Sequence, residues 1–66
     1  MSKAKWFKVI VRDADGCDMT GGSETQGKAN AIESAKCYLT DPEYKSDVRA
    51  LIVEDERGTV VWDWRL

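Results

Sequence analysis

Only one segment of the chain has the apolar spacing of a helix, and this limits its possible folds more than any other feature. The apolar residues of that segment recur at helical intervals, at Ala31, Ile32, Ala35, Tyr38 and Leu39. A single amphipathic helix covers only one face of a sheet. In a chain of 66 residues, the other face of any sheet therefore meets solvent or a partner.

The ends of this helix are predicted from capping signals. Ser23 followed by Gln26 has the spacing of a capping box, which predicts that the helix begins there. Asp41-Pro42 ends it, because the residue before a proline avoids the helical conformation. Gly27 weakens the first turn by about 1 kcal/mol relative to alanine.

The remaining segments have the composition of β-strands. Residues 6–12 are rich in β-branched and aromatic side chains, and residues 48–55 and 59–66 alternate between apolar and polar. After the Asp15-Gly16 turn signal, residues 17–20 are predicted to form a short edge strand. The predicted fold class is α+β, a small antiparallel sheet in ββαββ order with one amphipathic helix packed on one face. Residues 1–66 would form one domain, with residues 1–5 as a flexible basic tail.

The last two strands are predicted to pair through a two-residue turn at Arg57-Gly58. In that register Val53 faces Trp62, Leu51 faces Trp64, and Asp55 faces Val60. The apolar phase of this hairpin is predicted to pack under the helix together with three residues of the first strand. These residues are Leu51, Val53, Val60, Trp62, Trp64 and Leu66 with Phe7, Val9 and Val11.

Composition and charge narrow the functional classes. Hydrophobic residues make up 42% and charged residues 33% of the chain, as in ordinary globular proteins. The formal net charge is −2, although residues 1–12 hold four basic side chains and no acid. This is not the strongly basic footprint of a nucleic-acid-binding protein. No apolar run approaches the ~20 residues of a membrane-spanning helix, so no membrane association is expected.

The compartment is predicted from the N-terminus and the cysteines. The first residues carry basic side chains but no apolar core of a signal peptide. Cys17 and Cys37 are too few for a disulfide framework, so both are expected to be reduced thiols in the cytoplasm. Cys37 is interpreted as a packing residue beside the apolar stripe of the helix.

One string resembles a phosphate-binding loop. Residues 22–29 match the pattern G-x-x-x-x-G-K up to its last position. Ala29 then stands where a hydroxyl should bind Mg²⁺, and a chain of this length cannot form the parallel sheet that surrounds such loops. The string is therefore interpreted as the start of a capped helix.

Metal and catalytic sites are also not expected. The chain has no histidine, and Cys17 and Cys37 lie in different predicted elements, whereas zinc sites use close pairs of Cys and His. Asp13, Asp15 and Asp18 loosely suggest a calcium loop, but positions 17 and 19 are Cys and Met. We therefore predict that the protein is not an enzyme and that it has no catalytic residue, metal or cofactor.

The uncovered face of the sheet is the most informative candidate site. The proposed interaction residues are Trp6, Lys8, Ile10, Arg12, Ile52, Val61 and Arg65. An apolar patch surrounded by charges is typical of protein interfaces, which predicts a protein partner or self-association. Open sheets with aromatic and basic residues also stack single-stranded bases, so a single-stranded nucleic-acid-binding module is the alternative. Scattered surface apolar residues without any function are the third interpretation.

Overall fold

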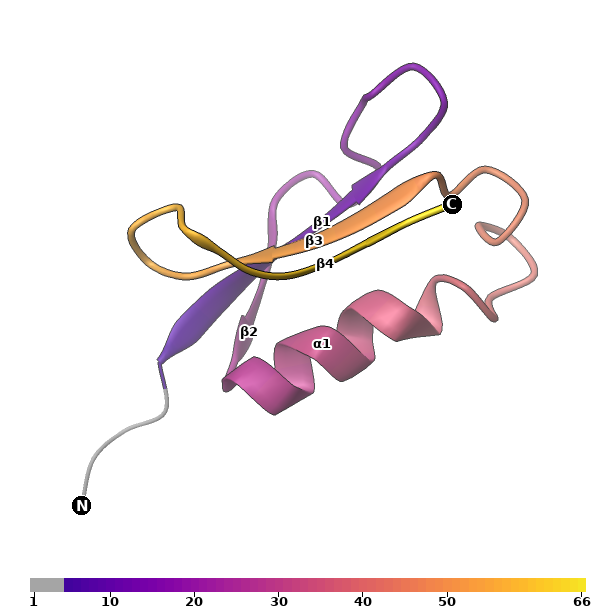
Figure 1. The fold of residues 1–66 in the computed structure, drawn as a ribbon. Coiled ribbons are helices and arrows are strands. Elements are labelled where there is room, and N and C mark those ends of the chain that lie inside the picture. The colour runs from indigo at the N-terminus through magenta and orange to yellow at the C-terminus, as the bar shows by residue number, and fades with distance from the viewer. Residues whose placement is uncertain (1–4) are drawn as a thin grey trace.

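The computed structural model describes residues 5–66, which form a four-stranded antiparallel sheet and one helix. Figure 1 shows the helix lying along one face of the sheet. The elements are β1 (Trp6–Arg12), β2 (Ser23–Gln26), α1 (Lys28–Cys37), β3 (Ala50–Glu54) and β4 (Val60–Arg65). The strand order is β2-β1-β3-β4. This confirms the predicted α+β fold in ββαββ order.

The core lies between α1 and the central strands. The buried cluster consists of Val9, Val11, Ala31, Ala35, Val48, Leu51 and Val53. α1 packs against β1, β2 and β3, and two fully buried alanines on its inner side let the helix backbone approach the sheet closely. β4 lies beyond β3 at the edge of the sheet. We call the side facing α1 the covered face and the other side the open face.

The predicted second strand and the predicted helix start are both wrong. Residues 17–20 contribute only an isolated bridge, between Arg12 and Asp18. The strand is formed instead by Ser23–Gln26, which pairs with β1 from Val9 to Trp6. The supposed capping-box residues therefore lie in a strand, and the helix begins at Lys28 without a side-chain cap.

The chain between the bridge and β2 explains this shift. Gly21 and Gly22 have φ values of 70° and 95°, a region that other residues rarely adopt. They turn the backbone, so that pairing with β1 resumes further along the chain. The polar segment 23–26 then completes the ladder of β1, whose backbone groups would otherwise lack partners.

The hairpin of β3 and β4 has the predicted register over most of its length. Val53 pairs with Trp62 and Leu51 with Trp64, as predicted. Near the turn the prediction is wrong, because a bulge shifts the register and Val60 pairs with Glu54 rather than with Asp55. The two tryptophans pack against the core but are only half-buried, because β4 lies at the margin of the region that α1 covers. Val60 and Leu66 are exposed, contrary to the prediction.

The turn between β3 and β4 contains three residues rather than two. The Asp55 N–H donates to the Thr59 carbonyl at 2.9 Å, and the Gly58 N–H donates to the Asp55 carbonyl at 3.0 Å. Gly58 has a φ of 81°, as expected for a type I turn followed by a left-handed residue. The Asp55 carboxylate accepts N–H groups from Arg57 and Thr59 at 2.9 and 3.0 Å.

The turn after β1 is built in the same way. The Asp13 N–H donates to the Cys17 carbonyl at 3.1 Å, and Gly16 has a φ of 82°. The Asp13 carboxylate accepts the N–H groups of Asp15 and Cys17 at 2.9 and 3.0 Å. The acidic spacing that loosely suggested a calcium loop is thus explained by a backbone-binding turn residue.

Two further predictions concern the chain ends and membranes. Residues 1–4 of the predicted basic tail lie outside the described residues. The fifth, Lys5, extends the ladder, because its carbonyl accepts the Gly27 N–H at 2.7 Å. Within residues 5–66, no helix has the length and apolar character needed to cross a membrane.

Candidate functional site

The open face consists of alternate residues from all four strands. Because Val9 and Val11 point to the covered face, the side chains between them point the other way. The register then assigns Trp6, Lys8, Ile10, Arg12, Glu24, Gln26, Ala50, Ile52, Glu54, Asp63 and Arg65 to the open face.

Cross-strand pairing arranges the charges of this face into rows. Lys8 pairs with Glu24 on β2 and with Glu54 on β3, which forms an acidic row of two carboxylates around one lysine. Opposite charges directly across a sheet stabilise it by about 0.2–1 kcal/mol per pair. The positive charge of Lys8 is therefore locally compensated.

A basic row lies at the other end of the face. Ala50 pairs with Arg12 on one side and with Arg65 on the other. The Arg12 guanidinium donates to the Gly16 carbonyl at 2.8 Å, so one of its N–H groups already binds the turn after β1. Arg65 is exposed.

Between these rows lies a middle row formed by Ile10, Ile52 and Asp63. Ile10 is only 7% exposed although no helix covers it, because it occupies the middle of a central strand among long neighbours. Ile52 is half-buried. The apolar area offered to a partner therefore comes mainly from Ile52, from Trp6, which is 50% exposed at the start of β1, and from Val60, which pairs with Glu54 and is 51% exposed.

Val61 does not belong to the predicted surface. It is half-buried and packs against the core of the covered face. The bulge between Val53 and Glu54 interrupts the strict alternation of side chains. The structure thus brings together the other six predicted residues and moves this one to the opposite face.

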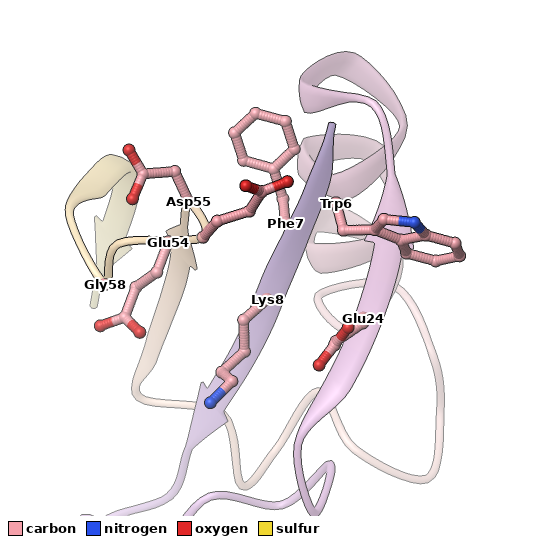
Figure 2. A pocket seen from close by; sticks show the side chains of 8 residues that line it. Trp6, Phe7, Lys8, Glu24, Glu54, Asp55 and Gly58 are labelled. Atoms are coloured by element: carbon pink, nitrogen blue, oxygen red, sulfur yellow. The ribbon is translucent and has the colours of Figure 1, made fainter. Parts of the chain in front are cut away.

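A shallow hollow of about 310 Å³ lies at the acidic end of the sheet. It is lined by Trp6, Phe7, Lys8, Glu24, Glu54, Asp55, Glu56 and Gly58. In Figure 2 the Lys8 side chain projects between Glu24 and Glu54, while the indole of Trp6 extends toward the β2 side. The hollow is therefore acidic with an aromatic side chain at its border.

The sequence prediction did not place Glu24 on the open face. Glu24 was assigned to a helix start, so its place beside Lys8 could not be anticipated. The available signal was the pair Gly21-Gly22, which separates residues 23–26 from the preceding turn and permits a new strand.

Asp18 is the centre of a small hydrogen-bond network where the β1–β2 ladder is interrupted. Its Oδ1 accepts the Val11 N–H at 3.3 Å, the Thr20 N–H at 3.0 Å and the Thr20 hydroxyl at 2.8 Å. Burial raises the pKa of Asp18, but the hydrogen bonds from Thr20 and Val11 and the charge of Arg12 outweigh it and lower the pKa below its ordinary value. The carboxylate replaces a missing strand partner, which is a structural role.

Tyr38 and Tyr44 close the other end of the core. Their ring centroids are 5.2 Å apart with an interplanar angle of 66°, an edge-to-face contact. Burial is the main cause that raises the pKa of Tyr38, and nearby Tyr44, Asp18 and Asp41 add to it. This tyrosine therefore stays protonated over the neutral range.

The other sequence features do not form a site. The phosphate-loop string is divided between β2 and the first residues of α1. Cys17 and Cys37 are free and exposed, so Cys37 is not the packing residue that was predicted. Among residues 5–66, no three His, Cys, Asp or Glu side chains are grouped so that they could hold a metal ion.

Comparisons of the chain with protein-family models, with curated proteins and with solved structures gave no significant match.

Proposed function

We propose that this protein is a non-enzymatic, cytoplasmic protein-interaction module that binds its partner through the open face of the sheet. The observation that carries the proposal is a four-stranded sheet with a helix on one face only. Its other face presents half-exposed Trp6 and half-buried Ile52 on either side of the acidic row. Aromatic anchors of this kind are enriched at protein interfaces.

The arrangement of charge supports a protein as the partner. The acidic row and the basic row lie at opposite ends of the open face, with the middle row between them. Such separation favours one orientation of a partner that carries the reciprocal charges. A partner surface with a basic group opposite Glu24 and Glu54 and an acidic group opposite Arg65 fits this face.

The proposal is tested by charging the apolar part of the face. We expect Trp6→Glu and Ile52→Lys to leave the thermal unfolding midpoint nearly unchanged and to remove the partner that the tagged wild-type protein captures from its own host, as identified by mass spectrometry. Lys36→Glu on the exposed side of α1 is the matched control and should retain the partner. Capture of the same proteins by all variants would contradict the proposal.

Single-stranded nucleic acid is the second candidate, and exposed Trp6 beside Lys8 is the observation in its favour. The two glutamates that flank Lys8 weigh against it, because they repel a phosphate backbone. The test compares the fluorescence response of the wild type and of Trp6→Phe on adding oligonucleotides at low salt. A salt-sensitive quench present only in the wild type would favour nucleic acid over a protein partner.

A further inference from the structure

Among residues 5–66, the outer edge of β4 is the least protected edge of the sheet. β4 has six residues, without the lysine or proline that often prevent edge strands from pairing with other chains, and its two charged residues, Asp63 and Arg65, have opposite signs. Leu66 donates its N–H to the Arg49 carbonyl at 3.0 Å. The backbone groups of alternate strand residues point to the same side, so those of Trp64, like those of Leu66, face β3. The backbone groups of Asp63 and Arg65 therefore point away from β3 to the outer edge.

The opposite edge differs in length, in its side chains and in its cover. β2 has only four residues, all polar, and α1 packs against it. The Gln26 carbonyl already accepts the Asn30 side-chain amide at 3.2 Å. β4 is therefore the edge with both free backbone groups and apolar side chains.

Apolar side chains along β4 are incompletely covered. Trp62 and Trp64 pack against the core but remain half-exposed. Leu66, which alternation places on the same side as the two tryptophans, is 82% exposed. This surface continues the covered face beyond the region under α1.

The charges of β4 show which occupant fits. Asp63 and Arg65 both project on the open face, with Trp64 between them. In an antiparallel pair of two β4 strands centred on Trp64, Asp63 of each copy lies opposite Arg65 of the other. Centring the pair on Asp63 would instead oppose two carboxylates, and centring it on Arg65 would oppose two guanidinium groups.

We propose that the protein forms a symmetric homodimer in which two β4 strands pair antiparallel about Trp64, with two Asp63–Arg65 pairs across the interface. The two Trp64 side chains then meet at a pair without backbone hydrogen bonds, where side chains lie closest. Trp62 of each copy covers Leu66 of the other. The result is one continuous sheet with both helices on the same side, closed by a two-fold axis.

This interface lies at the edge of the sheet and does not rest on the proposed function of the open face. Sedimentation velocity over a concentration series measures it directly, and the wild type is expected to be dimeric. Trp6→Glu should leave the dimer unchanged, which separates a failure of this inference from a failure of the proposed function.

Charge reversal tests the register. Asp63→Arg and Arg65→Asp each convert two attractive pairs into two repulsive pairs. The dimer dissociation constant of each variant should therefore be at least about tenfold higher than that of the wild type. Both positions are exposed, and the thermal melt of each variant verifies that it is folded. An equimolar mixture of the two variants restores both pairs and should form a heterodimer.

The double variant Asp63→Arg/Arg65→Asp is the matched control, because it exchanges the charges while keeping them complementary. It should dimerise like the wild type. A wild-type protein that remains monomeric at its highest soluble concentration would overturn the inference. Folded single variants that dimerise like the wild type, or a mixture that stays monomeric, would also overturn it.

Discussion

The two faces of the sheet bury apolar side chains by different means. On the covered face, α1 encloses residues such as Leu51 and Val53, which are fully buried. On the open face, Ile10 is buried only by its neighbours in the sheet, and Ile52 remains partly accessible. Adjacent residues of one strand, Leu51 and Ile52, therefore differ in what their loss should cost. Truncation should therefore cost more stability at Leu51 on the covered face than at Ile52 on the open face.

The largest effect is expected from Leu51→Ala. Its side chain is 0% exposed in the core, so truncation should lower the free energy of unfolding by about 2–5 kcal/mol. That is a large share of the stability of a domain this small. Urea denaturation of Leu51→Ala and Ile52→Ala measures the contrast directly. Equal losses in the two variants would break the distinction between the faces.

A smaller effect is expected from Trp62→Ala. Tryptophan is larger than leucine, but Trp62 lies on β4 beyond the region that α1 covers and is half-buried. The loss should be about 1–2 kcal/mol, since only part of its apolar area leaves water on folding. A loss as large as that of Leu51→Ala, measured in dilute monomeric protein, would show that the covered face extends fully over β4.

The smallest effect is expected at Asp18, which lies just after the turn that follows β1. Its folded-state pKa is lowered, so its contribution is complete above the ordinary value of 3.8 and is lost as the pH falls through the folded-state value. The side chain is largely exposed, so the contribution is small.

Asp18→Asn should therefore reduce the loss of stability on acidification in this range. The measurement is the thermal midpoint of both proteins across a pH series. Parallel curves for the two proteins would contradict a role for the ionised carboxylate.

Strand alternation was enough to predict the register of the β3–β4 hairpin. Val53 opposite Trp62 and Leu51 opposite Trp64 follow from the need to put apolar side chains on one face, because a slip of one residue would reverse all of them. The same alternation assigned Trp6, Lys8, Ile10 and Arg12 to the open face. It failed at Val61, where a bulge turns the side chain to the core. The apolar pattern of the sequence gives no sign of this bulge.

The position of β2 could not be predicted from local signals. Ser23–Gln26 is polar and short, and the spacing of its first and last residues matches a capping box. This segment forms a strand rather than a helix start, because pairing with β1 satisfies the backbone groups on that side of β1. Because the strand was misplaced, the position of Glu24 beside Lys8, and therefore the acidic row, was not predicted.

The sequence by itself determined the α+β class, the single helix, the apolar phase of the last hairpin and most of the open face. Each of these follows from a periodicity that individual residues carry. Only the tertiary structure decided where β2 pairs, where the bulge lies and how far α1 reaches across the sheet. Those outcomes depend on which backbone groups and apolar surfaces are left without partners after the stronger elements have packed.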